Sequence, residues 1–262
     1  MLRAMMSAGT GMVAQQINLD TIANNLANVN TTGFKGQRAE FTDLMYQTYR
    51  ASGSAGAGGQ SQPVAMQVGL GSQFASTATN FTNGGMQQTN NVLDLAVSGE
   101  GFFEVELADG TKAYTRDGSF KKDSEGNLVT SQGFKVTGPI QIDSRATAVT
   151  VMPDGTVNAV IPGSNDAVTQ GNIRLYMFPN ASGLTRLGGN LYVPGGASGD
   201  AAEVTPGTEG SGSIQSGALE SSNVQVVEEM VRMITAQRAY EINSKAIQTA
   251  DDMLQLLNQL KR

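Results

Sequence analysis

The chain has 262 residues, and its 17 basic and 23 acidic side chains give a net charge of −6 at pH 7. It contains no histidine and no cysteine, which excludes imidazole- and thiolate-based catalysis and zinc-thiolate sites. The acidic balance argues against nucleic-acid binding, because no basic stripe is available to neutralise phosphates. No apolar run approaches the roughly 18 residues of a membrane span.

The first predicted element is a helix that spans residues 1–33. Its apolar side chains recur in a seven-residue pattern, as along the seam of a coiled coil. We predict that six of them form an N-terminal assembly seam: Met5, Met12, Leu19, Ile22, Leu26 and Val29. Only Arg3 and Asp20 are charged in this stretch, whereas an exposed helix face normally carries many charges. The pattern predicts a helix that close neighbours enclose on several sides.

The end of this helix is predicted at Gly33, because residues 30–32 are poor helix formers and glycine is a common helix stop. The start does not fit a cleaved secretion signal. The apolar run after Arg3 is broken early by Ser7 and Gly9. If the protein leaves the cytoplasm, we expect another export route.

Residues 34–71 are predicted to connect the helix to the rest of the chain. Residues 50–63 are rich in Gly, Ser and Ala, which is typical of a flexible linker or loop. Apolar residues then alternate from Val64 to Leu70, as in a strand, and residues 46–49 are a candidate partner strand. The sequence leaves two alternatives open: a long hairpin with a glycine-rich tip, or a disordered linker.

Residues 72–221 are predicted to be rich in β-structure. Short stretches of strand length alternate with turn signals, which favours an antiparallel sandwich or barrel. Residues 195–217 are rich in Gly and Ser and are predicted to form a return loop. A glycosidase-like carboxylate pair is rejected, because the candidate acids occupy turn positions. These acids are Asp109, Asp117, Glu125 and Asp154.

Residues 222–262 are predicted to form a C-terminal helix with a second heptad stripe. The stripe defines a C-terminal assembly seam of seven residues: Met233, Tyr240, Asn243, Ile247, Ala250, Leu254 and Leu257. Asn243 interrupts the apolar stripe, as Gln15 does in the N-terminal one. We interpret both as candidate polar contacts that set the register between helices.

The predicted fold class is therefore α+β. Paired N- and C-terminal helices, packed like a coiled coil, enclose an inserted antiparallel all-β domain with a long hairpin or loop extension. Two long helices paired only with each other would leave much apolar surface in water. The two seams therefore predict self-association, whereas the alternative is two amphipathic helices that pack on one globular core.

Three separated motifs resemble those of the bacterial flagellar rod and hook proteins. Ala23–Lys35 (ANNLANVNTTGFK) is similar to the N-terminal motif of this family, and Ala236–Lys245 (AQRAYEINSK) is similar to its C-terminal motif. Gly99–Phe103 (GEGFF) and Tyr114–Phe120 (YTRDGSF) resemble its shared β domain. The resemblance covers essentially the whole chain, with the motifs in the family's order.

The resemblance implies a structural subunit, not an enzyme, with no metal or cofactor. It implies export through the flagellar type III apparatus without a cleaved signal peptide. The subunit would form a homo-polymer in the periplasmic rod of the basal body, a rigid hollow helical shaft that transmits torque from motor to hook. Its expected partners are proximal rod proteins, the hook protein, and the surrounding peptidoglycan and outer-membrane rings.

The segment from residue 46 to 71 looks like an insertion of the family member that builds the distal rod. We predict that it stiffens the rod through a further contact between neighbours. The residues assigned to this segment are Tyr46, Tyr49, Arg50, Pro63, Val68 and Gly69. The alternatives are a proximal rod component of the same family, a secreted β-domain binding module on a helical stalk, and an enzyme acting on peptidoglycan.

Overall fold

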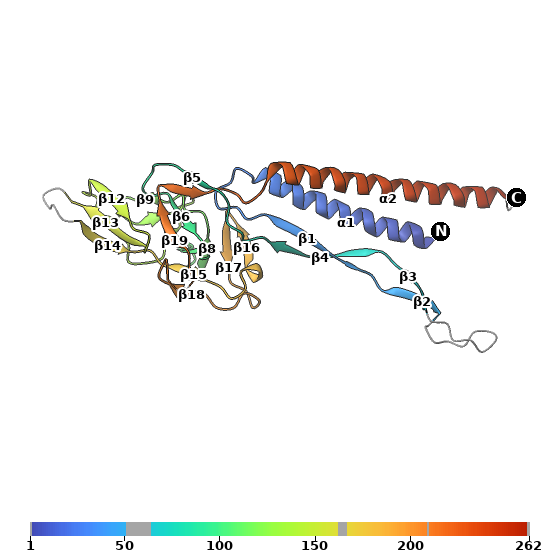
Figure 1. Ribbon diagram of the computed structural model, residues 1–262, viewed down its shortest axis with the longest axis horizontal. Coiled ribbons are helices and arrows are strands. Elements are labelled where there is room, and N and C mark those ends of the chain that lie inside the picture. Colours follow the sequence, from blue (N-terminus) through green and yellow to red (C-terminus); the bar gives the residue numbers. More distant parts are fainter. Residues whose placement is uncertain (1, 51–63, 162–166, 209, 261–262) are drawn as a thin grey trace. The chain divides into compact units, whose positions relative to one another are not determined.

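The structure is a computed structural model that describes residues 2–50, 64–161, 167–208 and 210–260 (Figure 1). The chain divides into two compact units, which are described separately. The helical unit comprises Met1–Leu26, Gln37–Ala78 and Gln225–Arg262. The β unit comprises Ala27–Gly36 and Thr79–Val224. No helix in the described ranges is both long enough and apolar enough to cross a membrane.

The helical unit is built on two long helices that lie side by side (Figure 1). Helix α1 spans Leu2–Ala27 and helix α2 spans Val226–Leu260. At a rise of 1.5 Å per residue they are about 40 and 50 Å long. Glu228 and Glu229 lie in the first turn of α2, where negative charge interacts favourably with the helix dipole. The predicted α+β class, with a helix at each end of a β-rich middle, is confirmed.

Helix α1 ends at Ala27 instead of at the predicted residue 33. Asn28 begins a turn, with the Thr31 amide donating to the Asn28 carbonyl at 3.1 Å. Asparagine and threonine hydrogen-bond locally and compete with helical bonding. Gly33 still has a special role, because its φ of +65° is the left-handed conformation that favours glycine. Residues 27–36 belong to the β unit.

Four strands between the helices form two pairs within the helical unit. Strand β1 (Gln37–Asp43) pairs with β4 (Ser72–Thr79). Strand β2 (Tyr46–Arg50) pairs antiparallel with β3 (Met66–Gly69). The predicted boundary at residue 72 separated β4 from β1, whereas the structure divides the chain between Ala78 and Thr79. The glycine-rich tip and Pro63 lie outside the described residues, so a continuous long hairpin remains a prediction.

The largest sheet of the β unit has seven strands in the order β16-β17-β8-β7-β11-β10-β9. Its strands are β7 (Phe103–Glu106), β8 (Lys112–Thr115), β9 (Lys121–Lys122), β10 (Leu128–Val129), β11 (Lys135–Val136), β16 (Thr185–Gly188) and β17 (Leu191–Val193). A second sheet contains β12 (Ala148–Val151), β13 (Thr156–Val160) and β14 (Val168–Asn172). The strand pairings in these two sheets are antiparallel.

Three two-stranded sheets complete the β unit. They pair β5 (Met86–Gln88) with β20 (Ala218–Glu220), β6 (Leu95–Ser98) with β19 (Ser213–Ser216), and β15 (Leu175–Met177) with β18 (Ala202–Val204). A single 3₁₀ turn at Ala181–Gly183 precedes β16 among the described residues. The predicted return loop over residues 195–217 is therefore wrong, because it contains β18 and β19. Its Gly and Ser content is typical of a loop, but strand partners elsewhere in the sequence make two parts of it strands.

The main core of the β unit is apolar and closed. It gathers Leu95, Val97, Phe103, Phe120, Leu128, Ile140, Ile142, Val151, Val157, Ile173, Leu175 and Ile214. The rings of Phe103 and Phe120 meet edge to face at 5.1 Å, a favoured aromatic geometry. A second cluster contains Phe102, Tyr114, Tyr176, Leu184 and Tyr192. The unit therefore has an apolar core of its own.

The turn assignment of the acidic residues is confirmed at two hairpins. Asp109 accepts a hydrogen bond from the Thr111 amide at 3.0 Å, and Asp154 accepts one from the Thr156 amide at 3.0 Å. Hydrogen bonds from Thr111 and from Thr156 lower the pKa of Asp109 and of Asp154, respectively. Both carboxylates thus stabilise turns, as the Asp-Gly signal indicated.

Candidate assembly surfaces and a buried ionic cluster

The predicted seam residues lie along α1 and α2 with different degrees of burial. In the N-terminal seam, Ile22 is buried, Met5, Met12, Leu19 and Leu26 are half-buried, and Val29 follows the end of α1 in a turn. In the C-terminal seam, Ala250 is buried, Met233, Asn243, Ile247 and Leu254 are half-buried, and Tyr240 and Leu257 are exposed. Coiled-coil-like packing along these seams remains a prediction.

A buried polar contact joins the two helices, and the sequence reasoning missed it. The amide of Asn25 donates to the Glu229 carboxylate at 3.4 Å, and both side chains are buried. The same amide group binds the backbone of Gln37 twice, donating to its carbonyl at 2.8 Å and accepting from its N–H at 2.9 Å. The available signal was the spacing of Glu229, which precedes the seam residue Asn243 by two seven-residue repeats.

Asn243 lies where the two helices approach closely. A Cβ atom added at Gly11 would lie 2.8 Å from the Asn243 side-chain nitrogen. Gly11 therefore makes room for the Asn243 amide at the seam. Gln15, the other polar seam residue, instead accepts a hydrogen bond from Asn18 on its own helix at 3.5 Å.

Both helices carry a further apolar stripe that is exposed. On α2 it consists of Val227, Met230, Val231 and Ile234, each more than half exposed. Their spacing of three, four and seven residues places them on one helix face, turned away from Glu229. On α1 the exposed apolar residues Leu2, Met6 and Val13 also share one face. Such stripes are typical of surfaces that another protein chain covers.

The strand pair β2–β3 is exposed along both strands. Tyr46 lies opposite Gly69, and a Cβ at Gly69 would lie 3.2 Å from the Tyr46 ring. Tyr49 lies against Arg3 of α1, with the guanidinium carbon 5.1 Å from the ring centre. Arg50 pairs with Met66, and Val68 pairs with Gln47. The described residues of the predicted stiffening segment are therefore close together, and most of their side chains face solvent.

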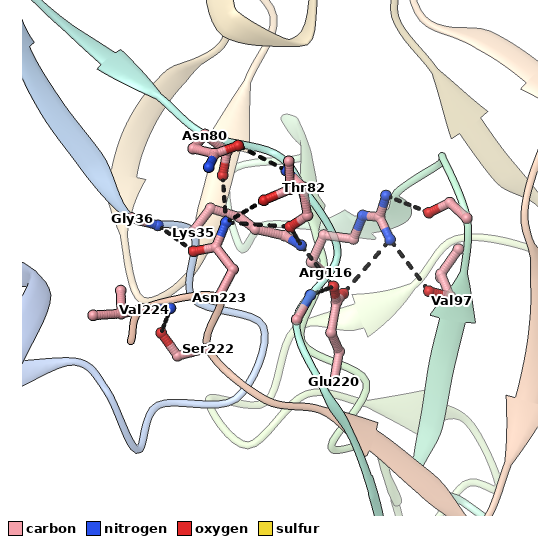
Figure 2. Close-up of polar contacts among 12 residues, drawn as sticks. Lys35, Gly36, Asn80, Thr82, Val97, Arg116, Glu220, Ser222, Asn223 and Val224 are labelled. Atoms are coloured by element: carbon pink, nitrogen blue, oxygen red, sulfur yellow. Dashed lines mark hydrogen bonds and ion pairs between the residues drawn. The ribbon is translucent and has the colours of Figure 1, made fainter. Parts of the chain in front are cut away.

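The β unit contains a fully buried ionic cluster, drawn in Figure 2. The Lys35 ammonium lies 2.6 Å from Oε1 of Glu220, and both side chains are 0% exposed. The Arg116 guanidinium lies 3.5 Å from Oε2 of the same carboxylate and is 2% exposed. Lys35 also donates to the Thr82 carbonyl at 2.9 Å, and the Gly84 amide donates to Glu220 at 2.9 Å. One carboxylate thus serves as the shared counter-ion of two buried cations.

Burial dominates the electrostatics of this cluster. Burial lowers the pKa of Lys35 and the pKa of Arg116, and the Glu220 carboxylate opposes both shifts. Arg116 donates to the Gly99 carbonyl at 2.8 Å and to the Val97 carbonyl at 3.4 Å. The Nε atom of Arg116 and the Oε2 atom of Glu220 are buried without a hydrogen bond. The ion pair between Arg116 and Glu220 at 3.5 Å therefore compensates the burial of Oε2.

Asn223 extends the cluster to three stretches of the chain (Figure 2). Its side-chain oxygen accepts from the Gly36 amide at 2.8 Å, and its nitrogen donates to the Asn80 carbonyl at 2.8 Å. The Asn80 amide in turn donates to the Gly36 carbonyl at 2.9 Å. The stretches around residues 33–36, 80–85 and 220–223 are therefore bound together at one place.

The chemistry of these features is structural. The charged groups of the cluster compensate one another and are closed to solvent, so they offer no base or nucleophile to a substrate. Among the described residues, no group of acids could hold a metal ion. The exposed apolar stripes are the kind of surface that another protein chain covers, and the buried cluster holds distant stretches of the β unit together.

Comparison with protein-family models agrees with this structural role. Residues 5–35 match the model described as flagella basal body rod protein. Residues 96–159 match the flagellar hook protein FlgE/F/G D1 domain, and residues 215–260 match the flagellar basal body rod FlgEFG protein C-terminal model. The three matches fall on α1 with its following turn, on the β unit, and on the stretch from β19 through α2.

Full-length relatives extend the similarity over the whole chain. The flagellar basal-body rod protein FlgG of Borreliella burgdorferi is 50% identical over 264 residues, covering 100% of both chains. The FlgG of Buchnera aphidicola subsp. Acyrthosiphon pisum is 47% identical over 260 residues, covering 99% of this chain and 100% of its own. The FlgF of Caulobacter vibrioides is 38% identical over 239 residues, covering 90% and 88%.

These matches place the chain among the structural subunits of the flagellar axis. The chain belongs to the flagellar basal-body rod protein family. The resemblance stated from the sequence motifs is confirmed, and so is the prediction of a structural subunit instead of an enzyme. The full-length FlgG relatives favour the distal rod assignment over a proximal FlgF-like component, and a secreted binding module is not favoured. Flagellar basal-body localisation follows from the same relatives.

Proposed function

We propose that the chain polymerises into the rigid, hollow helical shaft of the distal rod, which transmits torque from the motor to the hook. The observation that carries this proposal is the pair of exposed apolar stripes on α1 and α2. The two helices already pair with each other, so the stripes are available to helices of neighbouring copies. Burial of apolar surface contributes about 25 cal/mol per Å² and would favour such packing. Repetition of the same contact around an axis yields a helical polymer.

The ribbon β2–β3 supplies a second kind of contact in this proposal. Its exposed residues Tyr46, Tyr49, Met66 and Val68 would pack on a neighbouring copy at a different radius from the helices. Contacts at several radii resist bending and twisting better than contacts at one. Deletion of residues 46–71 should therefore yield polymers that bend more readily, as measured from filament curvature in electron micrographs. Polymers that stay straight and equally rigid would refute the stiffening role.

The proposed partners follow from the position of such a shaft. The ends of the polymer would join proximal rod proteins and the hook protein, and its outside would turn within the peptidoglycan and outer-membrane rings. The chain would reach the periplasm through the flagellar type III export apparatus and without a cleaved signal peptide. Mass spectrometry of protein isolated from basal bodies tests the last point, and an N-terminus shortened by a signal-sized peptide would contradict it.

The decisive experiment introduces a charge into the α2 stripe. Ile234→Glu should abolish polymers in negative-stain micrographs of the purified protein, while the helical content of the monomer is preserved, because Ile234 is 54% exposed. Leu187→Glu is the matched control, since Leu187 is a similarly exposed aliphatic residue on β16 of the β unit. Normal polymers from Ile234→Glu would contradict helix-mediated assembly.

Limited proteolysis of the unassembled chain provides an independent test. Without neighbours, both terminal helices should be cut quickly, because exposed helices open locally more often than a closed core. The β unit should remain as a resistant fragment. Assembled polymers should protect the helices. A monodisperse monomer with fully protected termini would show that the helices need no neighbouring copy.

A further inference from the structure

The last stretch of the β unit, residues 213–223, contacts regions far away in sequence. Strand β19 pairs with β6, and strand β20 pairs with β5. In addition, the Gly217 amide donates to the Asp94 carbonyl at 2.9 Å, and the Ile214 amide donates to the Pro153 carbonyl at 3.1 Å. The buried Ile214 side chain belongs to the main core. Without this stretch, strands β5 and β6 would have no sheet partners.

The fit of this stretch is close and specific. A Cβ atom at Gly84 would collide with the Ser221 carbonyl, and a Cβ at Gly99 would lie 2.7 Å from the Cα of Gly212, the residue just before this stretch. Side chains are therefore excluded where the stretch and its first neighbour cross earlier loops. Gly33 and Gly85 add backbone bonds, as the Gly33 amide donates to the Glu220 carbonyl and the Ser221 amide donates to the Gly85 carbonyl, both at 2.8 Å.

The docking of this stretch brings the negative charge of Glu220 to two buried cations. Lys35 and Arg116 are almost fully buried, and Glu220 is the carboxylate that lies between them. In a chain without Glu220 in place, the native packing would bury two cations without this counter-ion, which costs free energy because neither water nor a negative charge would solvate them. That packing is therefore unfavourable until residue 220 arrives. The neutral hydrogen bonds of Lys35 and Arg116 to Thr82, Val97 and Gly99 do not replace the missing negative charge.

We infer that residues 213–223 form a closing segment, and that the β unit locks into its native packing only when Glu220 docks between Lys35 and Arg116. A chain is synthesised from its N-terminus, so every other strand of the β unit is made before this segment. The β unit would thus remain incompletely folded, and able to pass through a narrow channel, until residues 213–223 are available. That property suits the export proposed above, but the folding order itself does not depend on export.

Pulsed hydrogen exchange during refolding of the full chain tests this order. We expect backbone amides of β5, β6 and β8 to become protected in the same kinetic phase as those of β19 and β20. Non-local pairing of this kind is slow, because distant segments must meet before contacts form. Protection of β6 and β8 in a phase clearly earlier than that of β19 and β20 would overturn the inference. This measurement uses the unaltered sequence and does not depend on any variant folding.

A charge-deletion series tests the role of Glu220. Glu220→Gln keeps the shape of the side chain but removes the counter-ion shared by two buried cations, so the unfolding equilibrium constant should rise by roughly 100- to 1,000-fold. The control Glu203→Gln removes a partly exposed carboxylate 3.6 Å from Arg174 and should change that constant by less than about fivefold. Equal effects of the two substitutions would contradict the electrostatic role.

The double variant separates charge from packing. Lys35→Met combined with Glu220→Gln removes one of the two buried cations together with the carboxylate. We expect it to be more stable than the sum of the two single variants predicts, because a cation that is absent needs no counter-ion. Simple additivity would show that Glu220 contributes through packing alone. If Glu220→Gln does not fold at all, recovery of folding by the added Lys35→Met gives the same answer.

Discussion

The two units of this protein differ in how far their apolar side chains are buried. The β unit packs a closed core in clusters built around Phe103 and Tyr114, and Glu220 is the counter-ion at its buried ionic cluster. The helical unit leaves Val227, Ile234 and most of the β2–β3 ribbon exposed. The difference indicates a division of labour. One unit buries a closed core, whereas the other exposes apolar surfaces that we propose are covered in an assembly.

The largest expected effect concerns the core of the β unit. Phe103 is 0% exposed and packs on Phe120, so Phe103→Ala should lower the free energy of unfolding of this unit by about 3–5 kcal/mol. The comparison variant Ile234→Ala, on the exposed stripe of α2, should change the stability of the monomer by less than about 0.5 kcal/mol. Denaturant titrations followed by circular dichroism measure both. Similar losses in the two variants would remove the distinction between the units.

An intermediate effect is expected inside the helical unit, where polar groups replace apolar packing. Asn25→Ala removes the hydrogen bonds to Gln37 and Glu229 and should cost about 1–3 kcal/mol. Thermal melting of the helices in the monomer would show the loss. Gln16→Ala, at an exposed position on the same helix, is the control and should melt like the unaltered protein. An unchanged melting curve for Asn25→Ala would show that this buried contact does not hold the helices together.

A smaller effect is expected from alkaline pH, and it should be confined to the β unit. Burial, followed by the Glu104 carboxylate, raises the pKa of Tyr176 to about 12. Burial also raises the pKa of Tyr114 and of Tyr192. Between pH 10 and 12 the folded state therefore binds more protons than the unfolded state, and the stability present below pH 10 is lost as the pH rises.

Equilibrium unfolding at several pH values, with tyrosinate absorbance as the probe, measures this loss. Tyr176→Phe removes one of the three phenols and should make the decline between pH 10 and 12 shallower. A stability that is constant over that range, in the protein and in the variant, would contradict the raised pKa of Tyr176.

The smallest effect on the monomer is expected at Asn243, which lies against Gly11 at the seam. Asn243→Leu should preserve helical content, since leucine is a good helix former, but it should loosen the register between subunits. Image analysis of polymers would detect the altered helical symmetry. Asn258→Leu, at an exposed position of α2, is the matched control. Polymers of unchanged symmetry from Asn243→Leu would show that Asn243 is merely tolerated at the seam.

Local patterns in the sequence were sufficient for several features. Heptad spacing predicted a helix at each end of the chain, and Asp-Gly signals predicted the turns at Asp109 and Asp154. These features depend on residues a few positions apart, so propensity and periodicity reveal them. The same locality explains the error at the end of α1, where the helix stops at Ala27 because turn-forming side chains compete with it before Gly33 is reached.

The tertiary structure alone decided the contacts between distant residues. Lys35 and Glu220 are separated by 185 positions, and Asn25 and Glu229 by 204, so no local pattern indicates either pair. Strands β18 and β19 lie in a stretch that resembles a loop in composition, and they become strands because β15 and β6 offer them backbone partners. The sequence by itself determined the helices, the turns and the family motifs. Long-range packing and burial decide which charged residues pair with each other and which stretch of the chain completes the core.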